Sequence, residues 1–161
     1  MKLEIEITRQ DYADFNQFHF IKYRLKRSAL IIAIVIIVMQ VILNGSHFDL
    51  AGTVISTMAG LLVYFGIIYF SLKNTRKIPS AGGAILGKRE MEFLEDTIKY
   101  KSETGEGSRI WSSIKRIEEG KNAYYLYLDT NMGLIIPKRF FGSEADQKDF
   151  VNLVKRKTKA I

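Results

Sequence analysis

Two long uncharged apolar runs stand out in the pattern of hydrophobic and polar positions. Residues 29–43 and residues 50–72 carry no charged side chain, and Gln40 is the one polar residue of the first run. A helix that spans a bilayer needs about 20 apolar residues, which the first run approaches when Ser28 and the stems of Lys26 and Arg27 extend it. We predict transmembrane helices at about 28–43 and 50–72. The alternative, two buried helices of a soluble core, is disfavoured because the flanking segments are too small to enclose helices that are apolar on every face.

The short link at residues 44–49 requires an antiparallel hairpin, and its flanking charges predict an orientation. Asn44 and Gly45 should end the first helix, and Asp49 should cap the second. The link carries no basic residue, whereas the outer ends of the hairpin are basic. The positive-inside rule then places both termini in the cytoplasm of a multi-pass plasma-membrane protein. The residues that set this topology are Lys22, Arg24, Lys26, Arg27, Lys73, Arg76 and Lys77.

The N-terminal segment predicts a strand that needs a partner. Leu3, Ile5 and Ile7 alternate with polar residues, which indicates a strand over residues 2–7 with one buried face. A lone strand is unstable, so residues 1–8 should join a sheet formed after the hairpin. Thr8 and Asp11 resemble a capping box, and from about Arg9 an amphipathic helix should run into the first span. Residues 9–73 then form the membrane part.

The C-terminal half predicts a small antiparallel domain. Residues 74–87 read as a linker, and residues 88–161 contain short alternating runs separated by expected turns at 95–96, at Gly105 and Gly107, and at 118–122. Residues 124–128 are apolar on both faces, as in a central strand. Ser143 should cap a last amphipathic helix. The fold class is an α+β membrane protein: the hairpin is inserted into, or precedes, a small antiparallel pleckstrin-homology-like (PH-like) β-barrel or sheet closed by a C-terminal helix.

Small residues on the second apolar run raise the question of self-association. Ser56 and Gly60 are four residues apart, so they form a small-xxx-small face. This face can pack against the first helix or against a second copy of the chain. We favour packing within the hairpin, and a homodimer remains an alternative.

Composition removes several kinds of chemistry. The 161-residue chain has no cysteine and two histidines, His19 and His47, which the predicted topology puts on opposite sides of the membrane. We therefore expect no metal and no cofactor. The acidic residues Glu118, Glu119 and Asp129 fall in expected turns without a companion His or Cys, and we expect no catalysis. The formal net charge is +7, and much of the basic excess flanks the apolar runs. This placement disfavours nucleic-acid binding.

Several motifs resemble the YcxB-like family of bacterial membrane proteins. Near the N-terminus these are Asp11-Tyr12, Phe15-Asn16 and Phe18-His19, followed by the pair of spans. In the C-terminal half they are Trp111-Ser112-Ser113-Ile114 with Ile117-Glu118, residues 124–128, and Ile135-Ile136-Pro137-Lys138-Arg139-Phe140. The histidine motif has Phe18 where the family has tyrosine. The resemblance implies this architecture and a PH-like C-terminal domain, and it implies no reaction.

Together these patterns predict a membrane-anchored interaction module that faces the cytoplasm. Lys138 and Arg139, after Pro137, are the candidate contacts for anionic lipid headgroups or a membrane partner protein. A solvated basic corner is the plainer interpretation of this pair. The alternatives are a self-associating regulatory or scaffold protein and, after it, an enzyme with an unrecognised active site. Trp111, the single tryptophan, is expected to be a core anchor at the start of a strand.

Overall fold

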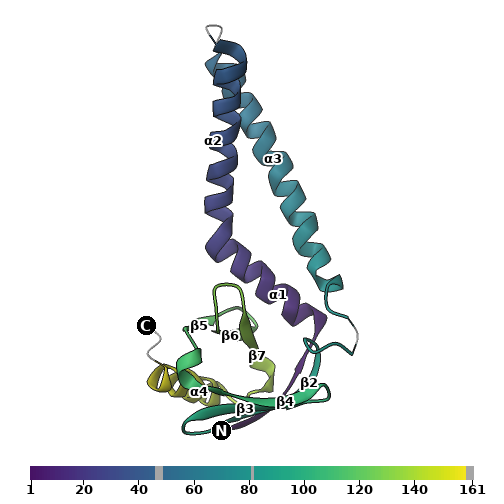
Figure 1. Ribbon diagram of the computed structural model, residues 1–161, viewed down its shortest axis with the longest axis vertical. Coiled ribbons are helices and arrows are strands. Elements are labelled where there is room, and N and C mark those ends of the chain that lie inside the picture. Colours follow the sequence, from purple (N-terminus) through teal and green to yellow (C-terminus); the bar gives the residue numbers. More distant parts are fainter. Residues whose placement is uncertain (46–48, 81, 159–161) are drawn as a thin grey trace. The chain divides into compact units, whose positions relative to one another are not determined.

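The computed structural model describes residues 1–45, 49–80 and 82–158. The chain divides into two compact units, one made of Met1–Phe15 with Thr75–Ile161 and the other of Asn16–Asn74 (Figure 1). The middle of the predicted link, including His47, and Ala81 of the predicted linker lie outside the described residues.

The second unit is a helical hairpin. Helix α2 (Leu25–Asn44) and helix α3 (Leu50–Asn74) run antiparallel (Figure 1). Both are long and apolar enough to cross a membrane, and almost none of their side chains is buried. The carboxylate of Asp49 accepts hydrogen bonds from the backbone N–H groups of Ala51 and Gly52, so the predicted cap of the second helix is confirmed.

Small and polar residues hold the two helices of the hairpin together. The Gln40 side chain donates a hydrogen bond to the Ser56 hydroxyl at 3.1 Å, and the hydroxyls of Ser28 and Tyr64 are hydrogen-bonded. A Cβ atom added to Gly60 would overlap the end of the Ile36 side chain. The small-residue face therefore packs inside the hairpin, as favoured from the sequence.

The path into the hairpin is not one continuous α-helix. Helix α1 (Arg9–His19) is followed by a π turn, η1 (Phe20–Arg24), before α2 begins. The N–H of Leu25 donates to the carbonyl of Phe20, which is the i to i+5 bond of a π turn. Sequence periodicity predicted the helices on both sides but not this interruption.

The first unit contains two antiparallel sheets. Strands β1 (Lys2–Ile7), β2 (Gly87–Phe93), β3 (Thr97–Ser102) and β4 (Gly105–Ile110) form a sheet in the order β1-β2-β3-β4. The predicted N-terminal strand is confirmed, and it pairs with β2, with Leu3 opposite Met91. One sheet is therefore built from residues on both sides of the hairpin in the sequence.

The second sheet has a central strand that is buried on both faces, which explains its apolar sequence. Strands β5 (Arg116–Glu119), β6 (Ala123–Tyr127) and β7 (Gly133–Pro137) pair with β6 in the centre. Leu126 joins the main core, where Phe150 of helix α4 (Glu144–Lys157) is also buried. On the opposite face, the rings of Tyr125 and Tyr127 lie 5.2 and 5.6 Å from the ring of Phe15 in α1. Both faces of β6 are covered, as the central-strand prediction requires.

The strands form two sheets and not the closed barrel that was one expectation. A 3₁₀ turn, η4 (Trp111–Ser113), carries the chain from β4 to β5, and strand pairing among the described residues stays within each sheet. Trp111 is buried and its indole N–H donates to the Leu94 carbonyl. The core position predicted for Trp111 is confirmed, although it lies in this turn and not at a strand start.

Two predicted turns are present but shorter than expected. Residues 103–104 form the turn before Gly105, which begins β4, and residues 120–122 connect β5 to β6, so Glu118 and Glu119 belong to β5. Gly107 lies inside β4, where a Cβ would lie 2.5 Å from the hydroxyl oxygen of Tyr100 at the paired position of β3. Cross-strand packing therefore explains the glycine at position 107.

Candidate interaction site

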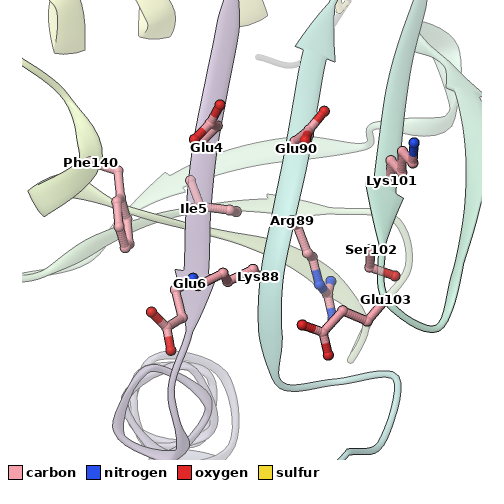
Figure 2. A pocket seen from close by; sticks show the side chains of 10 residues that line it. All are labelled: Glu4, Ile5, Glu6, Lys88, Arg89, Glu90, Lys101, Ser102, Glu103 and Phe140. Carbon is pink, nitrogen blue, oxygen red and sulfur yellow. The ribbon is translucent and has the colours of Figure 1, made fainter.

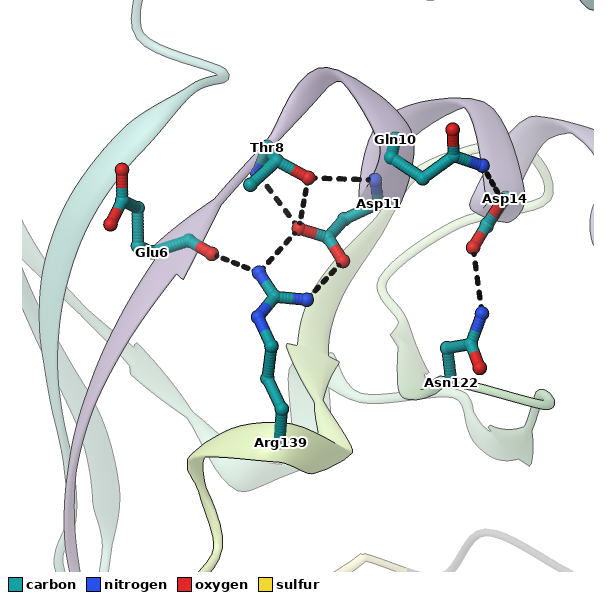
Figure 3. A network of polar contacts seen from close by, with 7 residues as sticks. All are labelled: Glu6, Thr8, Gln10, Asp11, Asp14, Asn122 and Arg139. Atoms are coloured by element: carbon teal, nitrogen blue, oxygen red, sulfur yellow. Dashed lines mark hydrogen bonds and ion pairs between the residues drawn. The ribbon is translucent and has the colours of Figure 1, made fainter.

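Arg139 lies in the short 3₁₀ turn η5 (Lys138–Phe140) that follows β7. Its two terminal nitrogens bind the two carboxylate oxygens of Asp11 at 2.6 and 2.7 Å, and one also donates to the Glu6 carbonyl at 2.7 Å (Figure 3). Asp11 also accepts bonds from the N–H and the hydroxyl of Thr8. This is the bidentate geometry in which arginine binds a carboxylate most strongly.

The surroundings of Asp11 favour its charged form. Burial by itself would raise the pKa of Asp11, but hydrogen bonds from Arg139 and Thr8 outweigh that effect, and the pKa lies below its usual value. The same bond to Asp11 raises the pKa of Arg139. Asp11 is 4% exposed at its side chain and Arg139 is 44% exposed, so the carboxylate depends on this one partially exposed cation.

Lys138 is also occupied within the domain. Its ammonium nitrogen lies 2.5 Å from a carboxylate oxygen of Glu119 and above the ring of Tyr124, 5.0 Å from the ring centre. Tyr124 in turn donates its hydroxyl proton to Gln147 of α4. The two basic side chains singled out from the sequence are thus engaged with acidic groups of their own domain.

The other predicted basic residues lie near the ends of the hairpin. Lys22 and Arg24 belong to the π turn, Lys26 and Arg27 to the first turn of α2, and Lys73 to the last turn of α3. In the first unit, Arg76 and Lys77 lie in the 3₁₀ turn η3 (Thr75–Lys77), where the Arg76 carbonyl accepts a bond from Arg9.

A hollow of about 600 Å³ lies on the four-stranded sheet next to the Arg139 turn (Figure 2). It adjoins the turn through Phe140, and Glu6, whose carbonyl binds Arg139, also lines it. Four acidic and three basic side chains share its lining with one aromatic, one aliphatic and one hydroxyl residue: Glu4, Ile5, Glu6, Lys88, Arg89, Glu90, Lys101, Ser102, Glu103 and Phe140. Burial lowers the pKa of Arg89, and its guanidinium binds the carbonyls of Ala84 and Ile85.

Strand register arranges most of these charges in alternation. Glu92 of β2 lies between Lys2 and Lys99 on the neighbouring strands, and Lys88 lies opposite Glu6. The exception is Glu4, which lies directly opposite Glu90, and Glu90 in turn lies opposite Lys101 of β3. Like charges at directly opposite positions destabilise a sheet, so this pair of exposed carboxylates is a local cost to the fold. A positive group from another molecule would relieve it.

The hollow suits a ligand of mixed charge. A surface with both signs in alternation offers several ion pairs to a polypeptide, whereas a purely anionic ligand would meet Glu4, Glu6 and Glu90. Among the described residues, no group of three or more His, Cys, Asp or Glu side chains could hold a metal ion. Sequence reasoning missed this site because Glu4 and Glu90 meet through strand register, which alternation alone does not specify.

The fold and the site define an α+β protein in which a sheet domain carries a mixed-charge hollow and a second unit consists of two long apolar helices. Residues 93–154, from the end of β2 to α4, match the family model described as YcxB-like protein, so the resemblance predicted from the sequence is confirmed over that segment. The chain matched no curated protein and no solved structure.

Proposed function

We propose that the protein is a membrane-anchored interaction module whose sheet domain faces the cytoplasm and binds a partner protein at the hollow around Glu4 and Glu90. The hairpin is the anchor, and the sheet domain is the part that recognises the partner. The single observation that carries the proposal is that Glu4 and Glu90 lie directly opposite each other in a hollow whose other charges alternate. Glu90 has Lys101 on its other side, whereas Glu4 lies on the first strand of the sheet and has no second cross-strand neighbour among the described residues.

The distribution of residues in the helical unit supports membrane insertion. Three of its polar side chains, Gln40, Ser56 and Ser28, form hydrogen bonds between or within the helices, as a bilayer favours. The buried hydroxyl of Thr57 in α3 is an exception among the described residues. Its basic residues gather at one end, and Asp49 starts α3 at the other. By the positive-inside rule, the basic end lies on the cytoplasmic side.

The order of elements supports a PH-like domain. Four antiparallel strands are followed by three more and then by a helix that packs Phe150 and Val154 into the core. A PH-like domain closes one end of its paired sheets with its terminal helix, which is the role that we propose for α4. The two sheets and α4 share one hydrophobic cluster.

A partner with a basic side chain would form an ion pair with Glu4 and Glu90. The repulsion between the two carboxylates would be relieved only in the complex. The arrangement therefore lowers the stability of the free domain and favours association with a partner. Of the two partner classes expected from the sequence, the charges of the hollow favour a protein over an anionic lipid at this site.

Photo-crosslinking in native membranes tests the proposal. A photoreactive amino acid replaces Lys88, which lines the hollow, in the otherwise unchanged chain. We expect a discrete protein adduct that the double variant Glu4→Gln/Glu90→Gln abolishes. The variant Asp149→Asn, which removes an exposed carboxylate from α4, is the matched control and should retain the adduct.

Two results would contradict the proposal. One is an adduct that survives Glu4→Gln/Glu90→Gln at the wild-type yield, because the carboxylate pair would then play no part in recognition. The other is the absence of any protein adduct from Lys88 in membranes that contain the chain at its native level.

A further inference from the structure

The helical unit concentrates positive charge at one end of the hairpin. Residues 16–74 contain one acidic residue, Asp49, and five basic residues: Lys22, Arg24, Lys26, Arg27 and Lys73. Because α2 and α3 are antiparallel, the start of α2 and the end of α3 lie at the same end of the hairpin (Figure 1). All five basic residues belong to that end, and Asp49 belongs to the other.

The single carboxylate of the unit does not neutralise this charge. Asp49 lies at the start of α3, where it binds the N–H groups of Ala51 and Gly52. The basic residues of the unit therefore lie at the opposite end of the hairpin from its one carboxylate.

The basic residues at this end lie on both sides of the hairpin and form what we call the collar. Lys26 and Arg27, in the first turn of α2, are separated by about 100° around the helix, Arg24 precedes them in the π turn, and Lys73 belongs to α3. Basic residues on two helices at one end of the hairpin suit a layer of anions better than a single flat partner. Lipid headgroups around an inserted helix form such a layer.

Exposed aromatic rings mark the depth at which this collar would lie. Tyr69 and Phe70, one turn before Lys73, are each 63% exposed, and Tyr23, beside Lys22, is 38% exposed. The ammonium of Lys22 lies 5.7 Å from the ring centre of Tyr23. Aromatic and basic residues at one level are typical of the headgroup region.

We infer that the collar residues Arg24, Lys26, Arg27 and Lys73 bind the phosphate groups of anionic phospholipids in the cytoplasmic leaflet. The inference rests on the proposed membrane insertion and gives that anchor a lipid preference. Lipid recognition is thereby assigned to the hairpin, while the mixed-charge hollow of the sheet domain is assigned to a protein partner.

Native mass spectrometry of the full chain in detergent tests the collar. The probe is an equimolar mixture of phosphatidylglycerol and phosphatidylcholine with identical acyl chains. A detergent micelle has no inner and outer side, so the effect of these charges on the direction of membrane insertion does not enter the measurement. Each lysine or arginine contributes about fivefold to the affinity of a basic surface for anionic lipid. Arg24→Gln/Lys26→Gln/Arg27→Gln should therefore lower phosphatidylglycerol affinity by up to about a hundredfold.

The matched control removes the same charge elsewhere. Lys155→Gln/Arg156→Gln/Lys157→Gln neutralises the last turn of α4 and should retain the preference for phosphatidylglycerol. Equal retention of the two lipids by the wild-type chain, or an unchanged preference in the Arg24, Lys26 and Arg27 variant, would overturn the inference. A chain that stays monodisperse without detergent would instead overturn the membrane anchor itself, so the two failures are distinguishable.

Discussion

The guanidinium of Arg139 forms two hydrogen bonds with the carboxylate of Asp11, a residue 128 positions earlier in the sequence. The same guanidinium binds the carbonyl of Glu6. This contact ties the turn after β7 to the end of β1 and the start of α1. It therefore joins the two chain segments, before and after the hairpin, that make up the sheet domain.

Removal of Arg139 should destabilise the sheet domain. Arg139→Gln leaves the buried Asp11 carboxylate without its cation, and we expect a loss of about 2–3 kcal/mol. That value is below the range for a fully buried pair because Arg139 is partly exposed. Urea denaturation of the detergent-solubilised chain, followed through the fluorescence of the single Trp111, measures the change.

A double-mutant cycle separates the ion pair from other effects. Because Asn at position 11 keeps hydrogen-bonding capacity without the charge, Asp11→Asn/Arg139→Gln should cost less than the sum of its single variants by about 1 kcal/mol or more. Strict additivity would show that the two side chains contribute independently.

Acid should weaken the domain through Asp11. The pKa of Asp11 is lowered in the folded state, so its contribution to stability is fully present above the unfolded pKa of about 4 and is lost as pH falls through the lower folded value. We expect the difference in unfolding free energy between the wild type and Asp11→Asn to be constant near neutral pH and to shrink below about pH 4. A difference that stays constant down to pH 2 would count against this role of the carboxylate.

Neutralisation of Glu4 and of Glu92 should change the stability of the sheet domain in opposite directions. Glu4→Gln removes a like-charge contact with Glu90, whereas Glu92→Gln removes a carboxylate between Lys2 and Lys99. Each change should be about 0.2–1 kcal/mol, a gain for Glu4→Gln and a loss for Glu92→Gln. Denaturation at low ionic strength measures both, and a loss of stability in Glu4→Gln would remove the basis for the proposed site.

Local sequence patterns predicted the elements better than their partners. Alternation at Leu3, Ile5 and Ile7 predicted β1, and Ser143 predicted the start of α4, because each signal depends on neighbouring residues. The ion pair between Arg139 and Asp11 was not predictable in this way. Its partner is remote in sequence, and a basic pair after a proline has the same local pattern whether it is solvated or bound.

Prediction of the site on the sheet requires the strand register as well as the alternation of polar and apolar residues. The outward direction of Glu4 follows from the pattern, but its position opposite Glu90 depends on which residues of β1 and β2 align. The glycines of β4 show the same limit. Gly107 has a turn-like local preference, and the ring of Tyr100 on the next strand determines why glycine is present.

The hairpin should accept a disulfide between its helices within one chain. A Cβ at Gly60 would lie 3.6 Å from Cγ1 of Ile36. That atom stands where the sulfur of a cysteine at position 36 can lie, so thiols at the two positions would be close together. The chain has no cysteine of its own, so Ile36→Cys/Gly60→Cys gives an unambiguous readout. Mild oxidation in membranes should form an intrachain bond, detected as a monomer that resists thiol labelling.

The matched control moves one cysteine along α3. A Cβ at Gly66 has no neighbouring atom within 4 Å, so Ile36→Cys/Gly66→Cys should stay reduced under the same conditions. A disulfide-linked dimer as the main product of the first pair would show that the small-residue face joins two copies and would favour the self-association alternative.

Thiol accessibility in spheroplasts tests the central claim, a membrane hairpin with a cytoplasmic sheet domain, most directly. Asn44→Cys reports the end of α2 next to the link, and Lys121→Cys reports the exposed connection between β5 and β6. A membrane-impermeant maleimide should label Asn44→Cys in intact spheroplasts and Lys121→Cys only after the membrane is permeabilised. Labelling of Lys121→Cys from outside, or equal labelling of both positions before permeabilisation, would contradict the account.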